Sequence, residues 1–278
     1  MHTKQLEHLS GYRSGANLFS IGMSLNTSVW RMFQSVELPA ADLKNLQPRK
    51  ILQVFREFTE LGVNALSGTL SRSTVVFNNV GFIGSGPIAQ ALAHHLVAAQ
   101  IPVYVSNSRG PHTLTELVGE LGDAAQAVTV EQAAKADLVI LALPFLRVPE
   151  LANVVPDWSG RIVVDATNQF AQYTPVYSGY VDLGEETGSE WVASHLAGAT
   201  IIKAFNTMSS SYLAADPRHH DGRQVVFYAG DDSTACADFD QLISRLGFAP
   251  VRVGGLRDGG RLMQLGGPLS LLHVIKQG

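Results

Sequence analysis

The sequence has one cysteine and no long apolar run, and each of these scarcities excludes a class of protein. A single thiol, Cys236, permits neither an internal disulfide framework nor a zinc site built from several cysteines, and it is typical of a reducing compartment. No uninterrupted apolar stretch approaches the roughly 20 residues that a membrane-spanning helix needs. We therefore expect a cytoplasmic location and no membrane partner.

An excess of basic residues is also missing. The net charge is -4, and the region after Asn78 holds 12 of the 20 basic and 19 of the 24 acidic residues, which gives it a net charge of about -7. Such a surface repels the phosphates of nucleic acids. The sequence also lacks the G-x-S-x-G turn of hydrolases and the H-E-x-x-H motif of zinc enzymes. We expect neither a nucleic-acid partner nor a metal site.

The chain divides into two regions of different pattern. Residues 1–78 are predicted to form a partly helical N-terminal extension, because apolar side chains recur at helical spacing between Ile51 and Leu61. From residue 79, short apolar runs alternate with helical patterns, which is typical of a doubly wound parallel sheet. We predict an α/β, Rossmann-like fold with an NADP-binding domain at 79–206 and a small C-terminal α+β domain, carrying the acceptor site, at 207–278.

Three helices of the second half are predicted from local signals. Thr187 and Glu190 fit the S/T-x-x-E capping box, so a helix is expected to begin there. Asp231 or Asp232 is expected to cap the next helix. A further helix is expected over 261–276. It would lie near the ligand-binding crevice, which open sheets of this kind form at the carboxyl ends of their strands.

The stretch from Gly84 to Ala89 carries the strongest local motif. It reads G-x-G-x-x-A between an apolar run and a helical pattern, which is the context of the dinucleotide fingerprint. Gly84 permits a tight turn, Gly86 lets the backbone approach a pyrophosphate, and helix N-terminal amides face the phosphates. A glycine-rich turn without a ligand is the alternative, and the strand and helix on either side argue against it.

The end of the second apolar run favours NADP over NAD. NAD enzymes usually place a carboxylate roughly 20 residues after the glycines to bind the ribose hydroxyls. This sequence has Ser106, Asn107, Ser108 and Arg109 there. Hydroxyl groups and a guanidinium can bind a 2′-phosphate, and no carboxylate repels it. The same turn can also cap the following helix, and the two roles are compatible.

Seven motifs in a fixed order carry a resemblance. They are "VGFIGSGPIAQAL", "VYVSNSRG", "LVILALPF", "VVDATNQ", "IIKAFNTM", "RQVVFYAGDD" and "LGFAPVRVGGL". Together they resemble the family of NADPH-dependent reductases of the deazaflavin coenzyme F420. They are also similar to the cytosolic reductase domain of the six-transmembrane metalloreductases, which passes hydride from NADPH to a flavin. The resemblance runs from Val80 to Lys276.

The resemblance implies a role for individual residues on each side of the crevice. The residues so implied are Ser85, Pro87 and Ile88 for the pyrophosphate, Ser108 and Arg109 for the 2′-phosphate, Leu143, Pro144 and Phe145 for the nicotinamide ribose, Ala204 for the nicotinamide, and Asn206, Thr207 and Met208 for the acceptor side. Two positions depart from the family pattern. Pro87 has no backbone N–H to donate to a phosphate, and "NTMS" replaces a histidine-containing segment, which leaves the acceptor open between F420 and FAD or FMN.

Three polar residues of the predicted crevice have open roles. Lys203 interrupts an apolar strand, so it either extends from a sheet edge into solvent or points into the crevice toward an anionic ring or phosphate. Asn168 can hydrogen-bond the cofactor or the acceptor, whereas Asp165 is expected to order the local turn.

The leading hypothesis is an oxidoreductase that transfers hydride between NADPH and a deazaflavin or flavin acceptor. Bound rings carry this chemistry, so the protein needs no nucleophile or strong base. An imine or carbonyl reductase of the pyrroline-5-carboxylate reductase type is an alternative, although that type often has a long helical C-terminal domain. A non-catalytic NADPH-sensing module is another. The resemblance also implies a homodimer.

Overall fold

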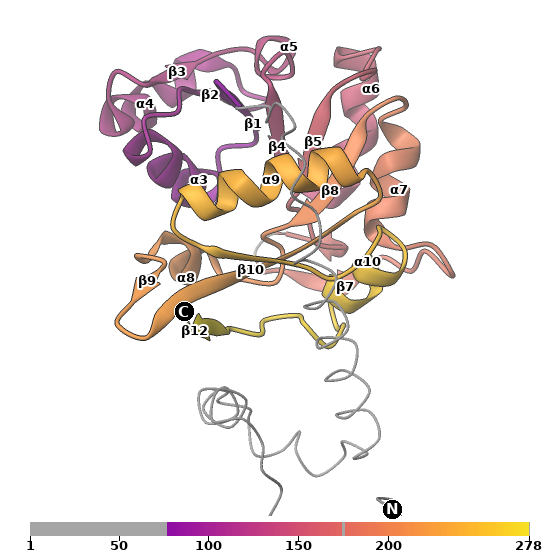
Figure 1. Cartoon of the computed structure of the whole chain (residues 1–278). Coiled ribbons are helices and arrows are strands. Elements are labelled where there is room, and N and C mark those ends of the chain that lie inside the picture. The colour runs from indigo at the N-terminus through magenta and orange to yellow at the C-terminus, as the bar shows by residue number, and fades with distance from the viewer. Residues whose placement is uncertain (1–76, 174–175, 278) are drawn as a thin grey trace, which may run out of the picture.

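The computed structural model describes residues 77–173 and 176–277 (Figure 1). The N-terminal extension predicted at 1–78 lies, up to residue 76, outside the described residues, and so does its predicted helix. None of the helices in the described part combines the length and apolar character needed to cross a membrane.

A mixed sheet forms the centre of the described structure. Its order is β11-β10-β8-β5-β4-β1-β2-β3, and β9 and β12 pair with β10 outside this path. In this order, the strands β8, β5, β4, β1, β2 and β3 each run parallel to their neighbours, whereas β10 runs antiparallel to β8. The strands are β1 (Val80–Ile83), β2 (Val103–Ser106), β3 (Ala125–Ala127), β4 (Leu138–Leu141), β5 (Ile162–Asp165), β8 (Thr200–Ala204), β9 (Arg218–His219), β10 (Gly222–Gly230), β11 (Ala249–Arg252) and β12 (Ile275–Gln277). A separate hairpin consists of β6 (Phe170–Gln172) and β7 (Ser178–Tyr180).

Helices cover both faces of this sheet. The helices are α3 (Pro87–Ala98), α4 (Thr115–Leu121), α5 (Val130–Ala133), α6 (Leu151–Val154), α7 (Gly188–His195), α8 (Ser210–Ala214), α9 (Ser233–Arg245) and α10 (Asp258–Met263), with short 3-10 segments at η3 (Pro111–Leu114) and η4 (Phe145–Glu150). Figure 1 shows α9 lying across the sheet on the same side as α3.

The hydrophobic core has a layer on each side of the sheet. Phe82 packs with Leu92 of α3 and Phe239 of α9 in one cluster. Its neighbour Ile83 belongs to the opposite cluster, with Trp158 and Val192 of α7. Successive side chains of a strand point to opposite faces, so a strand covered on both sides must be apolar throughout, as β1 and β4 are. The predicted Rossmann-like architecture is confirmed.

Two of the predicted helix starts are confirmed. The Thr187 hydroxyl accepts the backbone N–H of Glu190, and the Glu190 carboxylate accepts the N–H of Thr187, which completes the capping box of α7. Asp232 caps α9 by accepting two backbone N–H groups.

The helix predicted over 261–276 is wrong. Helix α10 ends at Met263, and turns lead from there to β12. Gly266 has φ +80, and a Cβ on Gly267 would lie 2.6 Å from the carbonyl oxygens of Arg261 and Leu262. The chain therefore folds back onto α10 in a conformation that only glycines allow.

Cys236 lies on the buried face of α9, and burial raises the pKa of its thiol. Because the thiolate is the reactive form, we expect a thiol reagent to label the folded protein on the order of 100-fold more slowly than the protein in denaturant. Labelling rates followed by absorbance across a urea series measure this difference. Equal rates in water and in denaturant would contradict it.

Candidate functional site

The ends of five strands lie in one row. The registers pair Ser106 with Ile83, Ile83 with Leu141, Leu141 with Asp165, and Asp165 with Lys203. The segments that follow these residues therefore emerge side by side at the carboxyl edge of the parallel sheet. Open sheets of this kind bind ligands there. The predicted glycine loop, the predicted phosphate-binding turn and the predicted acceptor-side residues therefore lie along the same edge of the sheet.

The glycine loop at the end of β1 has the geometry that its motif predicts. Gly84 has φ +114, and a Cβ there would lie 2.0 Å from the carbonyl oxygen of Ala142, so the turn requires glycine. Gly86 is the N-cap of α3, and a Cβ there would meet no protein atom within 4 Å. Space is thus open at the position where a pyrophosphate would approach the helix N-terminus.

Pro87 and Ile88 form the first turn of α3. Pro87 occupies the first helical position, where its missing N–H removes no intrahelical hydrogen bond. The Gln90 side chain donates to the carbonyl oxygen of Ser85 at 2.9 Å and holds the loop against the helix. The departure from the family pattern at Pro87 therefore leaves the helix intact.

The turn after β2 presents an unpaired guanidinium. Ser106 is buried and donates to the carbonyl oxygen of Phe82 at 2.7 Å. Asn107 accepts the backbone N–H of Arg109 at 2.9 Å and donates to Thr113 at 2.9 Å, so its side chain orders the turn. Ser108 and Arg109 are exposed. Within the described residues the Arg109 guanidinium has no carboxylate partner, and it is free to bind an anion.

The segment after β4 combines an exposed and a buried residue. Pro144 is exposed and Leu143 half-buried, whereas the Phe145 ring is buried 4.3 Å from the Trp191 ring. The Tyr173 hydroxyl accepts the N–H of Phe145 at 2.8 Å and donates to the carbonyl oxygen of Asn168 at 2.6 Å. Burial raises the pKa of Tyr173, which keeps this donor protonated. Tyr173 thereby joins the segments after β4 and β5.

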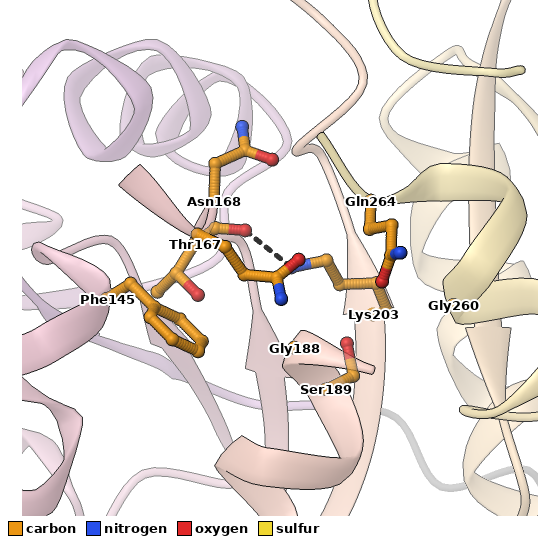
Figure 2. Close-up of a pocket in the computed structure, with 9 residues that line it drawn as sticks. Phe145, Thr167, Asn168, Gly188, Ser189, Lys203, Gly260 and Gln264 are labelled. Atoms are coloured by element: carbon orange, nitrogen blue, oxygen red, sulfur yellow. Dashed lines mark hydrogen bonds between the residues drawn. The ribbon is translucent and has the colours of Figure 1, made fainter. Parts of the chain in front are cut away.

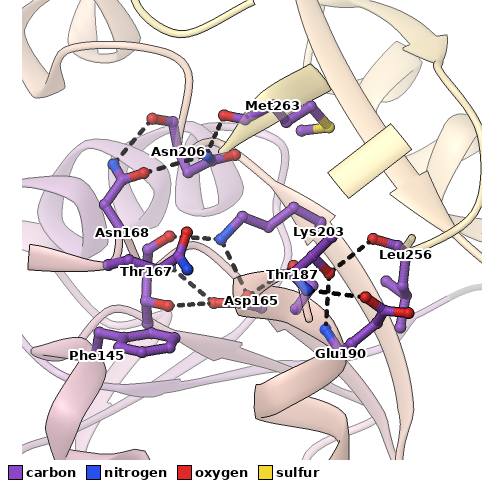
Figure 3. A network of polar contacts seen from close by, with 12 residues as sticks. Phe145, Asp165, Thr167, Asn168, Thr187, Glu190, Lys203, Asn206, Leu256 and Met263 are labelled. Atoms are coloured by element: carbon purple, nitrogen blue, oxygen red, sulfur yellow. Dashed lines mark hydrogen bonds and ion pairs between the residues drawn. The ribbon is translucent and has the colours of Figure 1, made fainter. Parts of the chain in front are cut away.

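Two asparagines face each other at the ends of β5 and β8. Asn168 donates to the carbonyl oxygen of Asn206 at 3.0 Å, and the Asn206 amide donates to Asn168 Oδ1 at 3.2 Å and to the carbonyl oxygen of Met263 at 2.8 Å (Figure 3). Both N–H groups of Asn206 are used, so the orientation of its amide is determined. Asn206 Oδ1 and Thr207 Oγ1 are buried and find no hydrogen-bond partner in the described part of the chain.

The backbone between the end of β8 and Asn206 is strained. Phe205 has φ +65, a conformation that aromatic residues rarely adopt. Its ring is buried against Phe239, and Ala204, Thr207 and Met208 are buried beside it. Strain of this kind collects at ligand sites, where the surrounding structure enforces it.

The prediction that Lys203 extends from a sheet edge is wrong, whereas its place at the acceptor side of the crevice stays a prediction. Lys203 lies in β8, between β5 and β10, so it cannot extend from a sheet edge. Its Nζ lies 3.0 Å from Asp165 Oδ2 and donates to the carbonyl oxygen of Thr167. The charge is therefore paired inside the protein. The prediction for Asp165 is confirmed, since its Oδ1 accepts from both the N–H and the hydroxyl of Thr167.

A small cavity lies beneath the segment after β5. Its volume is about 10 Å³, Thr167 and Asn168 belong to its lining, and Figure 2 shows Lys203 and Gln264 reaching toward it. Gln169, Gly188, Ser189, Phe145 and Gly260 complete its lining.

Sequence reasoning missed several residues of this region. Tyr173 and Gln264 lie outside the quoted motifs, and Gln169 and Ser189 were given no role at the site, although the sheet topology brings all four there. The one available signal was the polar content of residues 165–169 directly after a buried strand.

The described chain holds no group of three His, Cys, Asp or Glu side chains suited to a metal ion. The residues present fit a dinucleotide, because Gly86 leaves open space at a helix N-terminus and Arg109 offers an exposed guanidinium in the turn after the neighbouring strand β2.

Comparisons with known proteins agree with this geometry. Residues 79–169 match the family model described as NADP oxidoreductase, coenzyme F420-dependent. Metalloreductase STEAP3 of Rattus norvegicus is 29% identical over 206 residues, which cover 74% of this chain and 39% of that protein. The chain thus spans about two fifths of the length of this curated relative.

Solved structures add further similarity. A hypothetical protein from Sinorhizobium meliloti is 40% identical with a TM-score of 0.67, covering 72% of this chain and 96% of that one. A protein from Arthrobacter, described as an F420-dependent NADP reductase, is 20% identical with a TM-score of 0.56, covering 64% and 85% of the two chains, and at this identity it shows the fold alone. The glycine loop, the sheet that carries it and the family match over residues 79–169 together identify the chain as an NADP-dependent oxidoreductase.

Proposed function

We propose that this protein transfers hydride between NADPH and a deazaflavin or flavin ring. The observation that carries the proposal is the single row of strand ends, which brings the glycine loop and Arg109 to the same edge as Asn168 and Asn206. A cofactor whose phosphates were bound by the glycine loop and Arg109 would place its nicotinamide beside Asn168 and Asn206. The acceptor ring would then meet it there.

The cofactor itself supplies the hydride, and the protein's part is binding, orientation and exclusion of water. Gly84, Ser85, Gly86 and Ile88 would hold the pyrophosphate, and Ser108 and Arg109 the 2′-phosphate. Within the described residues Asn206 Oδ1 and Thr207 Oγ1 have no hydrogen-bond partner, and a ring that brought an N–H group to either oxygen would satisfy an acceptor that is costly to leave unpaired. Flavins and deazaflavins have such an edge.

The test is NADPH oxidation followed at 340 nm with F420, FMN, FAD or no added acceptor, each repeated with NADH. We expect turnover with at least one of the three rings and a preference for NADPH. Tight NADPH binding without turnover on any ring would contradict the proposal and favour a sensing role. Turnover with cyclic imines alone would favour the imine or carbonyl reductase alternative.

The acceptor site, a homodimer and a cytoplasmic location belong to the same proposal. A homodimer is implied by the family resemblance, and sedimentation of the NADPH-bound protein measures it. The single cysteine supports the proposed location, because proteins of a reducing compartment rarely depend on disulfides.

A further inference from the structure

Lys203 is a charged residue in the interior of the sheet. Only 4% of its surface is exposed, and burial lowers the pKa of its ammonium group, while the Asp165 carboxylate opposes this effect. Its Nζ pairs with Asp165 Oδ2 at 3.0 Å (Figure 3). A buried ion pair of this kind is often no more stabilising than two apolar side chains of the same size. Stability alone therefore does not account for a lysine and an aspartate at these two positions.

The Lys203–Asp165 ion pair forms hydrogen bonds with every polar group of Thr167, a residue of the crevice. Asp165 Oδ1 accepts the Thr167 N–H at 2.9 Å and the Thr167 hydroxyl at 2.6 Å, and Lys203 donates to the Thr167 carbonyl oxygen. Thr167 has no polar group outside this set. The position of the backbone at Thr167 is thus set by the two charged side chains.

Asn168, the next residue, transmits this position to the mouth of the crevice. Its amide exchanges two hydrogen bonds with Asn206, at 3.0 Å and 3.2 Å. Asn206 follows the strained Phe205 at the end of the strand that carries Lys203. Two sets of side-chain contacts therefore connect the ends of β5 and β8. One is the Lys203–Asp165 ion pair, and the other is the pair of hydrogen bonds between Asn168 and Asn206.

The surroundings of the pair reinforce it from two other elements. Ser189 of α7 donates to Asp165 Oδ2 at 3.1 Å. Gln169 and Gln264 line the cavity of about 10 Å³ beside Lys203, and Gln169 Nε2 and Gln264 Oε1 are buried without a hydrogen-bond partner among the described residues. This volume is close to what one water needs, and a water there could accept from Lys203 and Gln169 and donate to Gln264. Such a water would complete the hydrogen bonds of the ammonium group.

We propose that Lys203 is a positioning residue for hydride transfer, which acts through Asp165 and Thr167 to hold Asn168 and Asn206 where the nicotinamide and the acceptor ring meet. This role rests on the proposed function. Hydride transfer needs reacting carbons about 3 to 3.5 Å apart, so a small displacement of either ring lowers the rate steeply.

The test compares Lys203→Met with the wild-type full chain, using NADPH and the acceptor that the wild-type protein turns over fastest. We expect kcat to fall about 100-fold, because a displacement near 1 Å has an effect of this size. The Kd for NADPH should stay within about twofold, since the cofactor-binding loops follow β1 and β2. The primary isotope effect with 4-deuterated NADPH should rise as the chemical step becomes rate-limiting.

A second variant separates positioning from folding. Lys203→Met alone leaves Asp165 buried without its cation, so it can fail to fold. The double variant Asp165→Asn, Lys203→Met removes both charges, and we expect it to fold with a thermal midpoint near that of the wild-type protein while kcat stays low. Arg147→Met, which breaks an exposed ion pair with Glu150, is the matched control and should leave kcat unchanged.

Two results would overturn the role of Lys203. One is a folded Lys203→Met or double variant with wild-type kcat and isotope effect while the wild-type protein is active, which leaves the proposed function standing. The other is an absence of turnover by the wild-type protein with every flavin and deazaflavin, which removes the proposed function as well.

Discussion

Replacing Arg109 with alanine is expected to weaken NADPH binding about 10- to 100-fold and to leave NADH binding unchanged. A hydrogen bond to a charged group contributes roughly 1.5 to 3 kcal/mol, and 1.4 kcal/mol is a factor of ten in Kd. NADH has no 2′-phosphate, so it cannot lose this interaction. Titration of both cofactors by protein fluorescence or calorimetry measures the two Kd values.

The matched control for Arg109 is Arg147→Ala. Arg147 is also exposed, but it pairs with Glu150 and lies after β4, away from the turn at the end of β2. It should change neither Kd. An equal loss of affinity for NADPH and NADH in Arg109→Ala would mean that the guanidinium binds another part of the cofactor, or that the turn has collapsed.

Alanine substitutions at the two glycines of the loop after β1 should affect different properties. Gly84→Ala should lower the stability of the fold, whereas Gly86→Ala should weaken NADPH binding. At Gly84 the backbone has φ +114 and the added Cβ meets the Ala142 carbonyl, so Gly84→Ala should lower the free energy of unfolding by about 3 kcal/mol. A change of that size lowers Tm by about 10 °C in a domain of this length. Calorimetry of the apoprotein measures it.

Gly86→Ala should retain the fold and lose the cofactor. Its φ of -75° suits any residue, and the new Cβ meets no protein atom, so Tm should stay the same or rise slightly. The methyl group would occupy the space through which a pyrophosphate approaches, and overpacking of 1 to 3 kcal/mol predicts a Kd for NADPH roughly 10- to 100-fold higher. Unchanged NADPH affinity in Gly86→Ala would place the cofactor elsewhere.

Local signals in the sequence predict those parts of the structure that depend on neighbouring residues. The capping box at Thr187 and the turn at Gly84 are of this kind, because one short segment contains all of the interacting groups. The alternation of apolar runs and helical patterns likewise predicts a doubly wound sheet, and the order of the parallel strands agrees with it.

Lys203 could not be placed in the same way. Whether its strand lies at an edge or inside the sheet depends on β10, which pairs with β8 from residues that are distant in the sequence. The partner Asp165 is 38 positions away, and the register of β5 and β8 alone brings the two side chains together. The helix predicted at 261–276 is wrong for another reason, since Gly266 and Gly267 let the chain turn back onto α10 there.

The antiparallel pairing of β10 with β8 has a consequence for protein engineering. Ala204 lies opposite Tyr228 and Lys203 opposite Ala229, so the backbone hydrogen bonds of β8 on that side depend on the C-terminal residues. A chimaera joined after Asn206 would have to reproduce this register, because a slip of one residue exchanges the two faces of the strand. Acceptor specificity in this protein should therefore be redesigned by substitutions within the chain rather than by grafting a C-terminal segment from a relative.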